Sequence, residues 1–116
     1  MIVNAYRTMA AMVILALATP ASGQVVVSDL NGATLVFKCS VGAQSDPSFC
    51  LGYIIAIADV RSIQRGICRQ ARTTNPQLVA VVMAYMRRNH AKTSMAASFL
   101  VEAALSQAFP CGAPVR

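Results

Sequence analysis

Four cysteines, one histidine and four carboxylates are the residues of this 116-residue chain that could carry chemistry. A cysteine beside a histidine can act as a nucleophile, closely spaced cysteines can hold zinc, and paired cysteines can form disulfides. The histidine is His90, and the cysteines are Cys39, Cys50, Cys68 and Cys111. No two cysteines stand at Cys-x-x-Cys spacing, and their even number leaves no odd thiol to react with His90. The sequence therefore predicts two disulfides, and neither a metal site nor a catalytic cysteine.

The carboxylates do not indicate an enzyme either. They are Asp29, Asp46, Asp59 and Glu102, and no two of them stand at a spacing that suggests acid–base catalysis. The chain has no glycine-rich phosphate loop and no G-x-S-x-G motif. We therefore expect a protein without enzyme activity and without a cofactor. Asp59 is expected to be exposed at a helix edge, with an ion pair to an arginine such as Arg61 as the alternative, and His90 to be a solvated turn residue.

The N-terminus has the pattern of an export signal. Arg7 precedes the apolar run MAAMVILALA, and Pro20 and small residues follow it. The run has ten residues, about half of what a membrane-spanning helix needs. We predict a signal peptide over residues 1–23, cleaved before Gln24, and a mature periplasmic domain over residues 24–116. An uncleaved anchor or a buried helix is the alternative.

The charge of the mature chain is positive but scattered. Without Arg7, nine lysines and arginines remain against four acids, a net charge of +5. An exported chain meets little nucleic acid, and no aromatic residues lie between the arginines to stack on bases. We therefore expect no nucleic-acid partner and no stable membrane insertion, but a surface that suits an acidic protein partner.

Residues 46–65 form the most apolar segment of the mature chain. Asp46 followed by Pro47 predicts a helix start, and Gly66 predicts the stop. Residues 49–60 are apolar on nearly every side, which predicts a central helix that the others wrap. Gly52 costs about 1 kcal/mol relative to alanine in a helix interior, and we take it to indicate close approach of a neighbour.

Two further helices follow a basic loop, residues 67–74. Asn75 and Pro76 repeat the combination of cap and proline, and an apolar stripe at helical spacing follows: Leu78, Val81, Val82 and Tyr85. Ser94 can cap a last helix that Pro110 ends, with a core face formed by Ala97, Leu100, Ala104, Leu105 and Ala108.

The segment before the first cysteine has two interpretations. Asn31-Gly32 between two β-branched runs is a strong local hairpin signal over residues 24–39. A short helix that begins after Asn31 would instead place Leu35 and Cys39 on one face.

The length of the helix over residues 46–65 restricts the cysteine pairing. Cys50 and Cys68 would lie on the order of 27 Å apart along it, whereas a disulfide needs Cα atoms about 4.4–6.8 Å apart. Antiparallel helices would instead bring Cys39 to Cys50 at one end and Cys68 to Cys111 at the other. We predict these two pairs.

The motifs LVFKC, FCLGYIIAIADV, NPQLVAVVMAYMRRNH and MAASFLVEAALSQAFPC, with Cys68 before the third of them, occur here in the order seen in the Rap/Tai family. Its members are exported immunity proteins against peptidoglycan amidases delivered by type VI secretion. The resemblance covers Gly32 to Cys111 and implies an all-α fold, a small four- to five-helix bundle stapled by two disulfides and commonly a homodimer. It also favours the helix over the hairpin, because Gly32, Leu35 and Cys39 match the family's opening G-x-x-L-x-x-x-C.

The function implied by this resemblance is to bind a peptidoglycan amidase and plug its active site. The alternative is a periplasmic interaction or stress protein of the same fold without an amidase partner. The basic loop is anchored by Cys68 and by the helix start at Asn75, which lowers the entropy lost on binding, and arginine suits bidentate contacts to acids. We expect Arg69, Arg72 and Asn75 to contact the partner.

Overall fold

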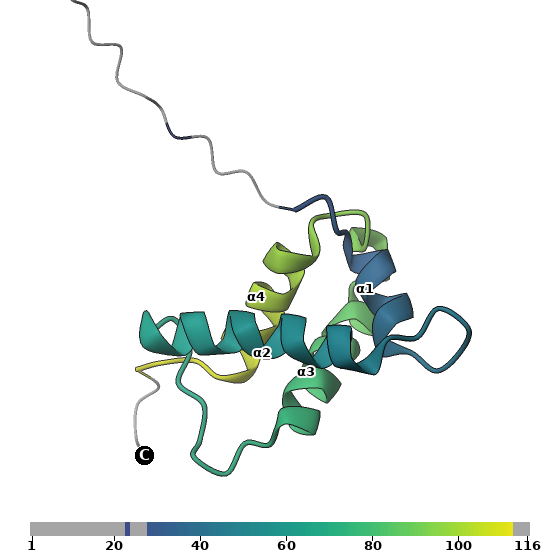
Figure 1. Cartoon of the computed structure of the whole chain (residues 1–116). Coiled ribbons are helices and arrows are strands. Elements are labelled where there is room, and N and C mark those ends of the chain that lie inside the picture. The colour runs from purple at the N-terminus through teal and green to yellow at the C-terminus, as the bar shows by residue number, and fades with distance from the viewer. Residues whose placement is uncertain (1–22, 24–27, 113–116) are drawn as a thin grey trace, which may run out of the picture.

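The described part of the chain folds into four α-helices and one short 3-10 helix. The computed structural model describes Gly23 and residues 28–112, so the expected signal sequence lies outside the described residues apart from Gly23. The helices are α1 (Gly32–Cys39), α2 (Pro47–Ile63), α3 (Asn75–Arg88), η1 (His90–Lys92) and α4 (Ala97–Ala108). The described residues contain no strand, which confirms the all-α prediction (Figure 1). None of their helices is long and apolar enough to cross a membrane.

The segment at Asn31-Gly32 is the start of a helix, as the family resemblance implied. The Asn31 side chain accepts a hydrogen bond from the Thr34 N–H at 2.8 Å and so caps α1. The backbone on either side of Asn31 pairs with the start of α4: the Gly32 N–H donates to the Met95 carbonyl at 3.0 Å, and the Ala97 N–H donates to the Leu30 carbonyl at 2.8 Å. The hairpin interpretation is wrong over the described residues 28–39, because the extended segment finds its partner far along the chain.

α2 lies across the other three α-helices and contacts all of them (Figure 1). Asp46 caps it by accepting the Phe49 N–H at 3.0 Å, as predicted. Only Cys50, Ile54 and Ala58, on one narrow face, are buried. The predicted central position of α2 is confirmed, but the other helices do not wrap around it: its opposite face is open, and Ile63 is 82% exposed.

Gly52 lies on that open face. A Cβ atom added there would meet no described atom outside its own stretch of helix within 4 Å. The described residues therefore do not contain the close neighbour that was expected. By contrast, a Cβ on Gly32 would press against the Leu100 side chain and the Thr93 backbone, so the close packing of α1 against the start of α4 requires glycine there.

α2 ends just before the predicted stop. Arg65, with φ of 57°, is the residue in the left-handed region, where Gly66 had been expected. A Cβ on Gly66 would meet the Arg61 guanidinium, the flexible end of a long side chain, which would have to move. That guanidinium pairs with Glu102 of α4 at 3.1 Å, which ties the end of α2 to α4.

α3 and α4 begin differently from the predictions. The cap of α3 is Thr74, which exchanges hydrogen bonds with Gln77 in a capping box, so Asn75 is the first helical residue. Ser94 does not cap α4, whose start has no side-chain cap and is held by the backbone bond to Leu30. The expected faces are buried with two exceptions: Val81 is half-buried and Ala108 is exposed.

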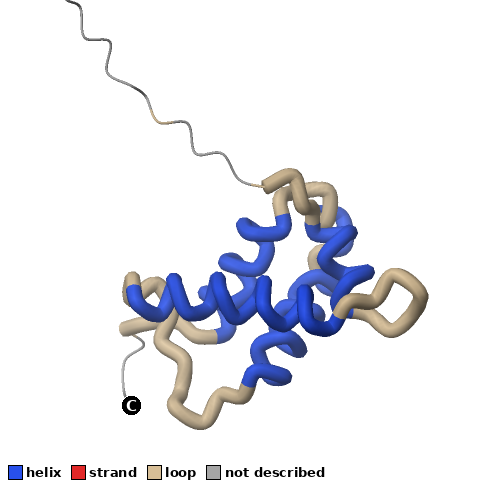
Figure 2. Tube along the Cα trace, viewed as in Figure 1, coloured by secondary structure: helices blue, strands red, loops and turns tan. Residues whose placement is uncertain are grey.

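Both predicted disulfides are present. Cys39 and Cys50 have Cα atoms 5.1 Å apart, and Cys68 and Cys111 have Cα atoms 4.9 Å apart. The first closes the loop between α1 and α2, and the second fastens the C-terminal end to the long loop before α3. Figure 2 shows these two loops in tan at opposite ends of α2.

Candidate partner-binding site

The basic loop, residues 67–74, is held firmly at both ends. At its start Ile67 is buried, and the Cys68 N–H donates to the Phe109 carbonyl at 2.9 Å beside the Cys68–Cys111 bridge. At its end the capping box of Thr74 joins it to α3. A turn inside the loop is closed by Thr73 N to Gln70 O at 3.0 Å. The anchoring expected from the sequence is confirmed, although Thr74 rather than Asn75 provides it.

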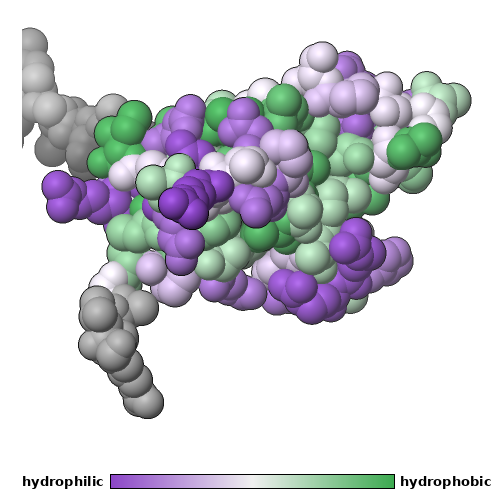
Figure 3. All heavy atoms as spheres, turned by 90° about the horizontal axis from the view of Figure 1, so that it is seen from below, coloured by the Kyte–Doolittle hydropathy of each residue, from purple (hydrophilic) through white to green (hydrophobic). Residues whose placement is uncertain are grey.

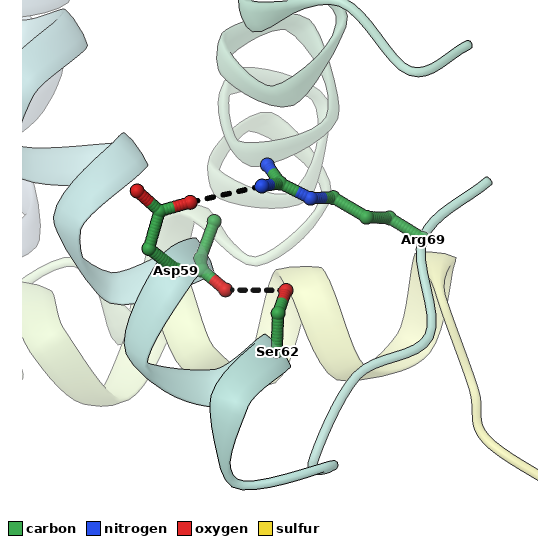
Figure 4. A network of polar contacts seen from close by, with 4 residues as sticks. Asp59, Ser62 and Arg69 are labelled. Carbon is green, nitrogen blue, oxygen red and sulfur yellow. Dashed lines mark hydrogen bonds and ion pairs between the residues drawn. The ribbon is translucent and has the colours of Figure 1, made fainter. Parts of the chain in front are cut away.

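Arg69 folds back onto α2. Its guanidinium donates to an Asp59 carboxylate oxygen at 2.9 Å, and the close-up in Figure 4 shows the two side chains pointing toward one another. The Asp59 side chain is 52% exposed, so it is both exposed and paired, with Arg69 rather than Arg61. An ion pair this open to water is worth about 0–1 kcal/mol. It sets the direction of Arg69 and leaves the guanidinium only partly available to a partner.

Arg72 does not share the ion pair of Arg69 with Asp59. It is exposed, and neither of the two ion pairs among the described residues involves it. It lines a groove of about 660 Å³ between the basic loop, the first turns of α3 and the end of α4. Figure 3 views the molecule from the side on which this loop lies, and hydrophilic and apolar residues alternate over that face. We call this hollow the Arg72 groove.

Of the three residues predicted to contact a partner, the structure therefore brings only Arg72 into the groove. Asn75 is exposed at the first turn of α3 but does not line it. Among the lining residues that the sequence did not indicate as partner contacts are Gln70, Thr73, Gln77 and Phe109. The one signal that could have found Phe109 is the predicted Cys68–Cys111 bridge, which requires the end of the last helix to lie beside the loop.

The carboxylates and His90 are dispersed. Asp46 caps α2, Asp59 pairs with Arg69, and Glu102 pairs with Arg61. His90 is exposed in η1. In the described part of the chain, no three histidine, cysteine or acidic side chains are grouped so that they could hold a metal ion. What the structure shows at the candidate site is a firmly anchored basic loop over a half-apolar groove.

The comparisons with known proteins agree with a protein-binding role. The model of one protein family, described as Rap1a immunity proteins, matches residues 31–111. The matched segment runs from the cap of α1 to the cysteine that closes the second disulfide, and it contains all four helices and the Arg72 groove. No match was found among curated proteins or among solved structures.

Proposed function

Because the chain belongs to the family of Rap1a immunity proteins, we propose that it binds a peptidoglycan amidase delivered by type VI secretion and occludes its active site. The family match is the observation that carries this proposal. Immunity by occlusion needs a preformed protein-binding surface and no catalytic group on the inhibitor. The Arg72 groove supplies such a surface, since its loop is fixed by a disulfide at one end and a capping box at the other.

The amidase proposal is tested by protection and by direct binding. The full chain would be co-expressed with each of a panel of peptidoglycan amidases directed to the periplasm, and growth would be followed. We expect one amidase whose toxicity the chain abolishes and which binds the purified protein. If the chain protects against none of them, the amidase proposal fails and a periplasmic interaction protein without an amidase partner is the better description.

The Arg72→Ala variant tests the surface separately. A solvent-facing arginine at the centre of a protein interface commonly contributes enough for a tenfold or larger loss of affinity when truncated. We expect a tenfold or larger loss of affinity for the amidase whose toxicity the chain abolishes, measured by calorimetric titration. Lys92→Ala is the matched control, because it removes one exposed positive charge from η1, away from the groove. If the wild type and both variants bind the amidase with equal affinity, the inhibitor proposal stands but the Arg72 groove is not the binding surface.

We further propose that residues 1–23 direct export and are removed. Two disulfides in the described domain suit an oxidising compartment such as the periplasm. The intact mass of protein recovered from the periplasm should correspond to a chain that begins at Gln24 or within a couple of residues of it. A mass that includes residues 1–18 would indicate an anchor instead.

The open face of α2 supports the proposal of a homodimer. Phe49, Gly52, Ala56, Val60 and Ile63 follow one another at spacings of three and four residues, and all five are exposed. This is the spacing of a helix-packing seam, and the bare backbone at Gly52 would let a second α2 approach closely. Within the described residues this seam is covered only at its margins, by Lys38 beside the Phe49 ring and by Ser98 and Glu102 across a hollow from Ala56 and Val60. Its middle, at Gly52, is open, so we propose a second copy of the chain there.

The dimer proposal predicts that Gly52→Glu converts the dimer into a monomer without unfolding it. The open space at Gly52 admits the new side chain, and replacing glycine in a helix interior favours the helix by about 1 kcal/mol. Light scattering after size exclusion would measure the mass, with Thr34→Glu on the exposed side of α1 as the control. A wild-type protein that is monomeric at high concentration, or a Gly52→Glu protein that stays dimeric, would contradict the proposal.

A further inference from the structure

A second hollow lies on the other side of α3, where α1 and η1 meet it. Its volume is about 250 Å³, and it is separate from the Arg72 groove, with which it shares no lining residue. Its main walls come from all three elements: Val36, Phe37, Met83, Met86, Arg87 and His90. We call it the α1–α3 cavity.

The walls of this cavity are apolar and adaptable. Met86 is buried at its floor, whereas Phe37, with 57% of its surface exposed, stands at its mouth. Methionine side chains are unbranched and polarizable, so they fit themselves to ligands of varied shape. The hollow is half open to solvent, and its volume of about 250 Å³ leaves room for the tail of a single-chain ligand.

The polar side chains that line the cavity are those of Arg87, His90 and Thr93. No aspartate or glutamate lines it. Of the acids, Asp59 and Glu102 pair with Arg69 and Arg61, and neither of these ion pairs, the two found among the described residues, uses Arg87. Arg87 is exposed, and its guanidinium can offer two parallel N–H groups to a carboxylate. The ligand that complements this site therefore has an apolar tail and an anionic head.

We propose that the α1–α3 cavity binds a single-chain anionic amphiphile, an alkyl carboxylate of medium chain length. The chain lies between Phe37 and the two methionines, and the carboxylate meets Arg87 with the His90 ring beside it. This binding activity does not depend on the proposed immunity function, because it uses a different face of α3. A protein side chain or a membrane surface as the occupant would give different outcomes in the tests below.

Methionine methyl resonances provide a direct test with sodium octanoate as the probe. The full chain has six methionines, and Met83 and Met86 line the cavity while Met95 does not. In a titration followed by proton–carbon correlation spectra, we expect the Met83 and Met86 methyl signals to shift and to saturate, with Met95 unchanged. Butyrate and 1-octanol, which lack the long tail and the anionic head respectively, should bind at least tenfold more weakly. Absence of any shift up to millimolar octanoate, or equal shifts at all three methionines, would overturn the proposal.

Two neighbouring arginines separate a specific site from general attraction to a basic surface. Arg87 lines the α1–α3 cavity, whereas Arg88 faces the gap between α3 and α4. Arg87→Gln should weaken octanoate binding about tenfold, the usual effect of losing a charge-assisted hydrogen bond, and Arg88→Gln should not change it. Equal weakening by the two substitutions would overturn the site, as would binding to phosphatidylglycerol vesicles without binding to free octanoate.

Discussion

Replacing Cys68 and Cys111 together by alanine should lower the free energy of unfolding by about 4 kcal/mol. The bridge joins residues 43 apart in sequence, and a crosslink removes more conformational entropy from the unfolded chain when the loop it closes is longer. It also fixes the start of the basic loop beside Phe109. Urea unfolding of the oxidised wild type and of the double variant, followed by far-UV circular dichroism, would measure the loss.

The other disulfide is the internal control for this prediction. Cys39 and Cys50 are only 11 residues apart, so their joint replacement by alanine should cost about 3 kcal/mol. The two double variants should also differ in function, since only the Cys68–Cys111 bridge borders the Arg72 groove. A larger loss for the Cys39–Cys50 pair would show that native packing at that end, and not loop length, determines the difference.

The start of α2 and the cysteine pairing were predictable because they depend on local chemistry and on chain geometry. Asp46 followed by Pro47 is a local signal, and the cap it predicts is present. The disulfide pairs followed from helix length, because a helix of the predicted span keeps Cys50 away from Cys68. The Asn31-Gly32 turn is the counterexample. Its local signal favours a hairpin, but the backbone groups of Leu30 and Gly32 bond to Ala97 and Met95 instead. Those two residues lie so far along the chain that a rule based on neighbouring residues does not include them.

The candidate site was predictable only in part. That the basic loop would be anchored followed from Cys68 and the helix start. Which of its arginines would be held in an ion pair did not follow from the sequence, because it depends on where α2 passes. Arg69 reaches Asp59, ten residues earlier in the chain, and Arg72 does not meet an acid in the described structure. The lining by Gln77 and Phe109 likewise arises from two helices that meet only in the folded chain.

Which face of α2 is buried could likewise not be predicted from the sequence. From Phe49 to Val60 the helix is apolar on nearly every side, so hydropathy alone does not distinguish the core from the open seam. The folded chain does distinguish them: Ile54 is 0% exposed in the core and Ile63 is 82% exposed. The difference between these two isoleucines should appear directly in the stability of the protein.

Ile54→Ala should therefore destabilise the fold by about 3 kcal/mol, and Ile63→Ala by no more than about 0.5 kcal/mol. Truncation at position 54 leaves a cavity in the core cluster to which all four α-helices contribute, and so removes both burial and packing contacts. The same truncation at position 63 removes atoms that already face water. Urea unfolding at a dilution where the protein is monomeric keeps any seam between two copies out of the comparison. Similar losses for the two variants would mean that α2 is packed on both faces within one chain, and this would remove the reason to place a second copy against Gly52.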